Sequence, residues 1–278
     1  LKNRAGMFYP VLFMKPNRSR GQPRGQSDQE FVDKRERFLR RTRDAVREAL
    51  KSRDMLLGTV TRSIEDLDKT INLLGEKLED WYGIYFPELK ADDKIQFAKA
   101  TLAIDKENMD EKELAVIFGQ TKATELIATA KSSLGVQLSK KDLSECLSLS
   151  RTILTLEKLR KDYDVYKKEL AEELCPNLSE VAGADIAAKL VSHMGTLARL
   201  AMLPASAIQV IGAEKALFKH LKNRNVPPPK HGIIFQHVKI SSSPKAVRGK
   251  IARTLANKLC LEAKADAFSK RRISGPLR

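Results

Sequence analysis

The feature that most restricts the fold is a run of apolar residues spaced alternately three and four positions apart. The run consists of Leu57, Val60, Ile64, Leu67, Ile71, Leu74, Leu78 and Trp81. This spacing puts one apolar stripe along an α-helix and is the pattern of a coiled-coil seam. Ser27 and Glu30 have the spacing of a capping box, and Gly83 and Pro87 are helix-ending residues. We therefore predict a single helix from Ser27 to Gly83, ~55 residues or roughly 80 Å long.

A second long helix is predicted over residues 142–174, with Pro176 as its end. Its apolar stripe is interrupted by Arg160 and Lys167, just as Glu36, Arg43 and Arg53 interrupt the upstream half of the first helix. Two shorter helices are predicted between the long ones, near 91–104 and 110–134. The two long helices most simply fold back antiparallel. The insertion between them then either meets a second copy of the chain or packs only within it, and the seam leaves both open.

Charge is distributed unevenly along the 278 residues, which carry a net charge of +16. Residues 1–27 contribute +6, residues 28–175 contribute −3, and residues 176–278 contribute +13. A basic excess of this kind points to a polyanionic partner, a nucleic acid or an anionic membrane surface. No apolar run approaches the roughly 18 residues of a membrane span. The charge therefore favours nucleic acid, bound mainly by the C-terminal third.

The C-terminal third is also predicted to be helical, over 178–201, 205–221 and 244–267. Ser206 and Gln209 have capping-box spacing, and Ser243 with Pro244 resembles a helix start. The apolar run 231–237 is too short to form part of a sheet, so the whole chain is predicted to be all-α. Phe218, Phe235 and Phe268 are the only aromatic residues of this region, and we expect them in the core. Without an exposed aromatic platform for stacking bases, recognition should act through phosphates and RNA shape.

Motifs for catalysis are missing from the sequence. It has no glycine-rich dinucleotide or phosphate loop, and no histidine pair with zinc-protease spacing. His231 and His237 flank a predicted loop, where hydrogen bonding or RNA contact is a better interpretation than metal ligation. The three cysteines, Cys146, Cys175 and Cys260, are far apart and fit buried thiols in a reducing compartment. We therefore expect no enzymatic activity, no cofactor and no metal.

Basic residues gather on the C-terminal helices at helical spacing. Lys215, Lys219 and Lys222 share one face after Gly212, and the last long helix carries Lys245, Arg248, Lys250, Arg253 and Lys258. A glycine at a helix start leaves backbone amides and the positive end of the helix dipole open to a phosphate. Glu214 is expected to cap this helix or to orient Lys215. The alternative is a solvated basic face on packed helices.

Four ordered blocks in this region resemble the signature of the Nop-domain family. They are Leu203–Lys219, which contains Gly212-Ala213-Glu214-Lys215; Pro176–Ser179 with Gly183-Ala184; Pro229–Phe235; and Arg248–Lys258. The chain is most similar to the archaeal Nop core protein of box C/D small ribonucleoproteins. The resemblance covers roughly 28–270.

The resemblance implies a scaffold protein that binds a box C/D guide RNA already folded as a kink-turn by a small ribosomal-type protein. It also implies a homodimer formed through the coiled coil, and recruitment of the methyltransferase fibrillarin by an N-terminal domain. The protein would lie in the cytoplasm of an archaeal cell, or in the nucleolus of a eukaryote. Only 27 residues precede the coiled coil, so we expect fibrillarin to be recruited only where that N-terminal domain is present.

We therefore predict four segments. Residues 1–27 are a basic linker or a remnant of an N-terminal domain, 28–175 a coiled-coil dimerisation domain, 176–270 a Nop domain, and 271–278 a basic tail. The residues expected to contact RNA are Gly212, Ala213, Glu214, Lys215, Lys219, Lys222, Lys230, His231, Arg248, Lys250 and Arg253. Two alternatives stay open, a Nop-domain splicing factor and a coiled-coil assembly protein without specific RNA binding.

Overall fold

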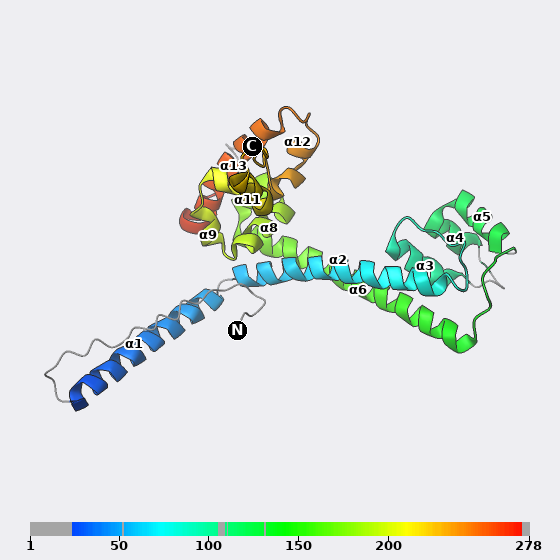
Figure 1. Cartoon of the computed structure of the whole chain (residues 1–278), viewed down its shortest axis with the longest axis horizontal. Helices are drawn as coiled ribbons and strands as arrows, with labels where there is room; N and C mark the ends of the chain where they lie inside the picture. Colours follow the sequence, from blue (N-terminus) through cyan, green and yellow to red (C-terminus); the bar gives the residue numbers. More distant parts are fainter. Residues whose placement is uncertain (1–23, 52, 105–108, 110, 131, 274–278) are drawn as a thin grey trace. The chain divides into compact units, whose positions relative to one another are not determined.

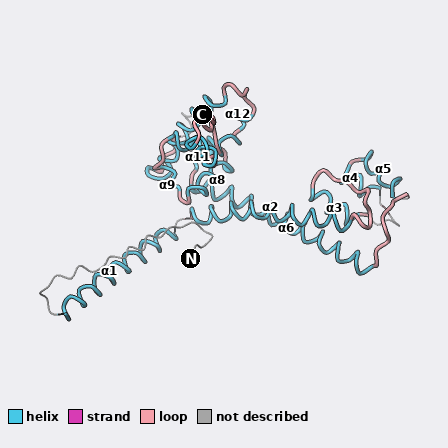
Figure 2. The backbone as a smooth tube through the Cα atoms, in the orientation of Figure 1, coloured by secondary structure: helices cyan, strands magenta, loops and turns pink. Residues whose placement is uncertain are grey.

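The computed structural model describes residues 24–51, 53–104, 109, 111–130 and 132–273. Every regular element in these ranges is a helix, as Figure 2 shows by the absence of strand colour, and the predicted all-α class is confirmed. The predicted segments 1–27 and 271–278 fall largely outside the described residues. The chain divides into two compact units, Leu1–Ser52 and Arg53–Arg278.

The first unit contributes one helix, α1 (Arg24–Lys51). It begins three residues before Ser27, so the predicted capping box is wrong. All its side chains from residue 29 to 47 are exposed, including Phe31 and Phe38. The prediction of one ~55-residue helix is also wrong, because a separate helix, α2, starts at Asp54. Charged residues interrupt the apolar stripe of α1, so burial does not hold the two segments in one continuous helix.

The second unit is organised by two long helices, α2 (Asp54–Tyr82) and α6 (Lys140–Leu174). They lie side by side in Figure 1 and run antiparallel, since Arg53 pairs with Glu173 and, further along, Asp68 pairs with Arg160. Every seventh residue of the predicted stripe is buried: Leu57, Ile64, Ile71 and Leu78. Trp81 at its end is exposed instead. The antiparallel arrangement and the helix end at Gly83 are as predicted.

The charges that interrupt the stripe of α6 are paired with acids. Lys167 is almost completely buried, and its ammonium lies 2.6 Å from an oxygen of Asp164 and 2.7 Å from one of Asp185. Hydrogen bonds from Lys167 and from the adjacent Lys168 lower the pKa of Asp164 to about 2. A buried ammonium needs such partners to offset its desolvation. The basic residues that interrupt the apolar stripe, Arg160 and Lys167, therefore join α6 to other helices through ion pairs with Asp68 and Asp185.

Three short helices pack at the end of the pair farther from the C-terminal helices: α3 (Lys94–Ala103), α4 (Glu111–Phe118) and α5 (Gln120–Ala130). Tyr82, Tyr85 and Phe86 form the centre of this core. The predicted single helix over 110–134 is wrong, because Gly119 has a φ of +85° and separates α4 from α5.

The C-terminal helices surround a second core, which also takes in Leu57 of α2 and Leu170 of α6. These helices are α7 (Pro176–Ala182), α8 (Ala184–Met194), α9 (Leu197–Ala201), α10 (Ala205–Val210), α11 (Glu214–Lys222), α12 (Val238–Ser241) and α13 (Arg248–Lys264). A 3-10 helix, η1 (Ile233–Gln236), precedes α12, and a π-helix, η2 (Ala265–Ser269), follows α13.

Several predicted helices in this region are divided. Gly183 and Gly195 have φ values of +85° and +86° and break the predicted helix 178–201 into α7, α8 and α9. Left-handed backbone of this kind is easy only for glycine. The predicted helix 205–221 breaks in the same way at Gly212.

Both helix caps predicted in this region are wrong, although the predicted helix start at residue 205 is correct. Helix α10 begins at Ala205, and α13 begins at Arg248, five residues after Ser243. The side chain of Gln209 donates instead to the carbonyl of Lys230, and that of Ser243 to the carbonyl of Lys239. Tertiary contacts occupy the side chains that local spacing assigned to caps.

Asp266 of η2 fixes the start of α7. Its carboxylate accepts hydrogen bonds from the backbone N–H groups of Asn177 and Leu178, at 3.2 and 2.9 Å, and from the side-chain amide of Asn177 at 2.6 Å. The amide oxygen of Asn177 in turn accepts from the N–H of Ile273. This network supplies the cap that the N-cap residue Cys175 does not, and it joins the two ends of the C-terminal region.

Candidate nucleic-acid interface

The first block of the candidate site is the turn at Gly212, between α10 and α11. Its φ is +84°, and a Cβ there would lie 2.6 Å from Cγ1 of Ile233, so both conformation and space require glycine. The Gly212 N–H donates to Oε1 of Glu214 at 2.7 Å, and Nε2 of His193 lies 2.8 Å from the same oxygen. Burial raises the pKa of Glu214, but the Gly212 and Glu214 amides and His193 together bring it below its usual value.

This geometry changes the role expected for the turn. The sequence suggested amides open to a phosphate, whereas the Gly212 amide is already taken by a carboxylate. Capping of α11 by Glu214 is not observed, because Gly212 lies before the helix and the helix start at Ala213 has no side-chain cap hydrogen bond; orientation of Lys215 by Glu214 stays a prediction. The Gly212 amide is therefore not available to a phosphate, and Gly212, Ala213 and Glu214 shape the turn that leads into α11.

The second block, residues 230–233, lies directly against this turn. The N–H of Ile233 donates to the Ile211 carbonyl at 2.7 Å, and that of Gly232 to the Gln209 carbonyl at 2.9 Å. A Cβ on Gly232 would lie 1.9 Å from the Ile211 oxygen, so the two backbones approach too closely for any side chain. The two sequence blocks thus form one structural unit.

The third block, the start of α13, is joined to the second by an aromatic contact. The rings of His231 and Phe235 stack with their centroids 4.5 Å apart, and the Arg248 guanidinium lies 5.4 Å from the Phe235 centroid. Burial, followed by the charge of Arg248, lowers the pKa of His231. Arg248 also donates to the carbonyls of Ser243 and Ser241. His231 is therefore neutral near pH 7, and both it and Arg248 support the loop.

The remaining predicted basic residues are exposed. We call them the basic surface: Lys215, Lys219, Lys222, Lys230, Lys250 and Arg253. None of the six has a carboxylate of a described residue within ion-pair distance. Lys230 lies next to α13, since a Cβ on Gly249 would be 3.5 Å from Cδ of Lys230. Lys222 stands at the far end of α11, roughly 12 Å along the helix axis from Glu214.

Helix α11 has no buried residue. Phe218 and Leu221 lie three residues apart on it, and each is 63% exposed. The expectation that Phe218 and Phe268 belong to the core is therefore wrong, while Phe235 packs against the core. Apolar side chains placed among lysines on an unburied helix are typical of a surface that meets a protein as well as a polyanion.

Other expectations concern metals, thiols and membranes. In the ranges that the structure covers, no three His, Cys, Asp or Glu side chains are grouped so as to hold a metal ion. Cys146, Cys175 and Cys260 are all buried free thiols, as predicted. None of the described helices is long and apolar enough to span a membrane.

An all-helical region with a tight turn at Gly212, a basic surface and an exposed amphipathic helix is typical of a nucleic-acid-binding scaffold protein. Residues 63–276 match the model of the Nop family, described as "snoRNA binding domain, fibrillarin". The chain belongs to this family, as the four sequence blocks indicated.

Named relatives agree with this assignment. The chain is 40% identical over 228 residues to an uncharacterized NOP5 family protein of Methanocaldococcus jannaschii, covering 81% of this chain and 55% of that protein. It is 33% identical over 221 residues to nucleolar protein 56 of Caenorhabditis elegans, covering 76% of this chain and 45% of the relative. The chain thus spans about half the length of these relatives.

A solved structure is also similar. It is a crystal structure of a fibrillarin/Nop5p complex, which aligns with a TM-score of 0.50 and 29% sequence identity. The alignment covers 89% of this chain and 73% of the other. The higher identity to the archaeal NOP5 protein than to nucleolar protein 56 agrees with the archaeal branch predicted from the sequence.

Proposed function

We propose that this chain is a scaffold of a box C/D small ribonucleoprotein, which guides 2′-O-methylation of RNA, and that its basic surface binds the guide RNA beside a kink-turn. The observation that carries the proposal is the meeting of three basic sequence blocks, whose six exposed cations have no carboxylate partner among the described residues. Unpaired lysine and arginine side chains held on rigid helices bind phosphates by releasing counterions. The family's description as snoRNA-binding supports RNA as the polyanion.

A kink-turn-binding protein is proposed as the second partner on the same face. Phe218 and Leu221 are exposed between Lys215, Lys219 and Lys222 on α11. Burying two such side chains against a protein stabilises a complex by roughly 1.5–3 kcal/mol each, before the entropy lost on binding is counted. Helix α11 thus presents cations to RNA and apolar groups to the protein that folds it.

The experiment is a titration of RNA at several salt concentrations. Lys219→Ala combined with Arg253→Ala removes one cation from α11 and one from α13. The matched control, Lys264→Ala with Lys270→Ala, removes two exposed cations outside the basic surface. We expect the slope of log affinity against log salt to flatten by about two for the first pair and to stay unchanged for the second. Equal slopes in both pairs contradict the assignment.

Recruitment of fibrillarin and methyl transfer are proposed at the level of the whole particle. The chemistry is assigned to fibrillarin, and this chain serves as its scaffold where the N-terminal domain is present. Methyl incorporation into target RNA should therefore require added fibrillarin. Methyl incorporation by the purified chain alone would instead show that the chain itself is a methyltransferase. In a eukaryotic cell the particle is expected in the nucleolus, and in an archaeal cell in the cytoplasm.

Self-association through the α2–α6 region is proposed as well. Val116 of α4 and Leu134, which follows α5, are exposed by 88% and 90%. Apolar groups left in water at the end of a helical pair are suited to meeting a second copy. Leu134→Asp should convert a dimer to a monomer in sedimentation equilibrium while leaving the helical content unchanged. A wild-type chain that is monomeric at micromolar concentration argues against this part.

A further inference from the structure

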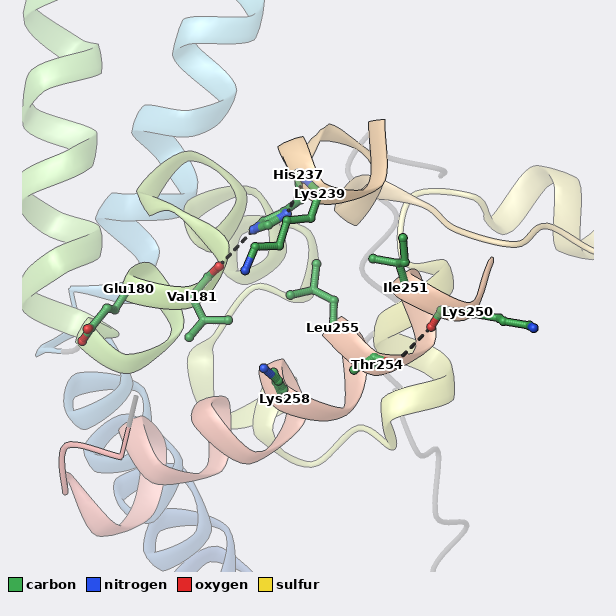
Figure 3. A pocket seen from close by; sticks show the side chains of 9 residues that line it. All are labelled: Glu180, Val181, His237, Lys239, Lys250, Ile251, Thr254, Leu255 and Lys258. Carbon is green, nitrogen blue, oxygen red and sulfur yellow. Dashed lines mark hydrogen bonds between the residues drawn. The ribbon is translucent and has the colours of Figure 1, made fainter. Parts of the chain in front are cut away.

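A cavity of about 570 Å³ lies between α7, α12 and α13 (Figure 3). Its size is within the range of about 300–1,000 Å³ that is usual for small-ligand sites. One side is aliphatic and consists of Val181, Ile251 and Leu255. Only Thr254, a rim hydroxyl that donates to the Lys250 carbonyl, adds a neutral polar side chain besides His237. The cavity therefore offers an apolar wall that suits a flat or aliphatic group.

Three lysines, Lys239, Lys250 and Lys258, also line the cavity. Figure 3 shows Lys239 and Lys258 on opposite sides of the aliphatic wall, whereas Lys250 points away. No carboxylate among the residues that the structure describes lies within ion-pair distance of Lys239 or Lys258. Two uncompensated ammonium groups facing one apolar wall make a site for an anion with an apolar body.

Two carboxyl groups near the cavity, those of Glu180 and Glu262, do not cancel this charge. The carboxylate of Glu180 points away from the lysines in Figure 3. Glu262 follows Lys258 by one helical turn and is completely buried, with neither oxygen hydrogen-bonded. Burial raises the pKa of Glu262 to about 8, so this group is mostly neutral at pH 7. The cavity keeps its positive character near neutral pH.

His237 makes one wall of the cavity rigid. Its Nε2 lies 3.1 Å from the Val181 carbonyl, and its Nδ1 accepts a hydrogen bond from the N–H of Lys239 at 3.2 Å. Since a carbonyl only accepts, the ring hydrogen must be on Nε2, which defines the neutral tautomer. The imidazole thereby ties the start of α12 to α7 and holds Lys239 at the rim.

We propose that this cavity binds one unpaired nucleotide of the RNA, with its base or ribose against Val181, Ile251 and Leu255 and its flanking phosphates on Lys239 and Lys258. The inference rests on the proposed function, because it extends the RNA from the basic surface. Helix α13 carries Lys250 and Arg253 of that surface and also Leu255 and Lys258 of the cavity. Lys250 and Lys258 are roughly 12 Å apart along the helix axis, so a strand following α13 passes from one to the other.

The chemistry predicts a contact that is tolerant of base identity. The wall is aliphatic, and His237 is the only aromatic side chain that lines the cavity. Proteins that bind single strands gain sequence preference mainly from hydrogen bonds to base edges, whereas stacking on aromatic rings accepts any base. This cavity should instead distinguish a single-stranded extension from none, and should contribute through burial and phosphate contact.

The test compares two kink-turn RNAs, one blunt and one with a five-nucleotide single-stranded extension containing 2-aminopurine. Two variants remove the site: Lys239→Ala with Lys258→Ala, and Thr254→Trp, which fills the cavity from an exposed position on its rim. Lys245→Ala with Lys264→Ala is the control, since both lysines are exposed and neither lines the cavity. Each protein is titrated with each RNA in the presence of the kink-turn protein.

We expect the extension to strengthen wild-type and control binding by roughly tenfold, the scale of one buried base or two phosphate contacts, with a change in 2-aminopurine fluorescence. Both cavity variants should bind the blunt RNA like the wild type and lose that gain. A gain retained by both variants, or an extension without effect, overturns the nucleotide site while leaving the proposed function intact. The nucleotide site is also overturned if an acidic peptide competes for the cavity while the RNA extension gives no gain in affinity.

A separate titration of the chain alone with the five-nucleotide strand keeps the two proposals distinguishable. Fluorescence that changes in the wild type but not in Thr254→Trp supports the cavity even if no kink-turn RNA binds. Equal responses from both proteins overturn it.

Discussion

The buried carboxyl of Glu262 allows a quantitative prediction about stability. Glu262 lies on α13 inside the C-terminal core, with no exposed surface and no hydrogen-bond partner for either oxygen. Burial raises its pKa from 4.5 to about 8, and the neighbouring Asp266 adds to the shift, while Lys258 opposes it. In the unfolded chain the same group ionises near its ordinary pKa. The folded protein therefore retains a proton that the unfolded chain releases.

The sign of the effect follows from this difference. Below about pH 4.5 the carboxyl is neutral in both states and contributes no pH dependence. Between pH 4.5 and about 8 the unfolded chain is favoured as pH rises, by ~1.4 kcal/mol per pH unit. The free energy of unfolding should therefore be lower at pH 7 than at pH 4.5 by about 3 kcal/mol on account of this one group. Above pH 8 the loss is complete.

Glu262→Gln removes the titration while keeping the shape of the side chain. We expect the variant and the wild type to have similar stability at pH 5, and the variant to be more stable by about 3 kcal/mol at pH 7. Urea unfolding followed by circular dichroism at pH 5, 6, 7 and 8 measures the difference. Glu172→Gln, at an exposed position on α6, is the matched control.

The difference between variant and wild type isolates Glu262 from other titrating groups. Burial also raises the pKa of Asp266, so some loss of stability with rising pH should remain in Glu262→Gln. A difference that stays constant from pH 5 to pH 8 would refute the reasoning, because it would show that the carboxyl ionises alike in both states.

Three further substitutions test other contacts. Gly212→Ala forces a left-handed φ on alanine and a Cβ 2.6 Å from Ile233, so it should lower the free energy of unfolding by about 1–3 kcal/mol in a urea titration, and an unchanged midpoint would contradict the turn geometry. Asp266→Ala leaves the two amide N–H groups at the start of α7 without their acceptor and should cost about 2–4 kcal/mol by the same assay; a loss below 1 kcal/mol argues against the network. Phe218→Ala should change stability by less than about 0.5 kcal/mol, because the ring is exposed, yet weaken binding to the preformed complex of RNA and kink-turn protein in a gel-shift titration. Unaltered affinity would remove α11 from the protein contact.

Much of the helical framework follows from periodicity. The seven-residue recurrence from Leu57 to Leu78 identifies the buried face of α2, and Pro176 ends α6 close to its predicted boundary. Long helices have many residues that repeat the same signal, so single exceptions such as Lys167 do not hide them. The exceptions themselves depend on distant partners, since Asp185 belongs to another helix.

Helix breaks were predicted less well, because they depend on backbone angles and tertiary contacts. Gly195 and Gly212 lie within stretches whose apolar pattern continues on both sides, and only their positive φ shows that the helix stops. The start of α2 at Asp54 was also missed. There the carboxylate of Asp54 accepts a hydrogen bond from the N–H of Leu197, a residue 143 positions away.

The candidate site, too, was predicted only in part from the sequence. The sequence blocks predicted which basic residues share a surface, and the structure places Lys230 next to Gly249 of α13. Sequence alone did not show that Glu214 occupies the Gly212 amide, or that Arg248 packs over Phe235. It also did not associate Lys239 of α12 with Lys258 of α13, which both line the cavity.

We propose that one surface of this chain recognises RNA and its kink-turn protein jointly. The most direct measurement is the affinity of the chain for a box C/D kink-turn RNA, with and without the kink-turn protein, at one salt concentration. We expect markedly tighter binding to the preformed complex, and loss of that advantage when Phe218 and Lys219 are both replaced by alanine. Equal affinity for free RNA and for the complex would contradict it.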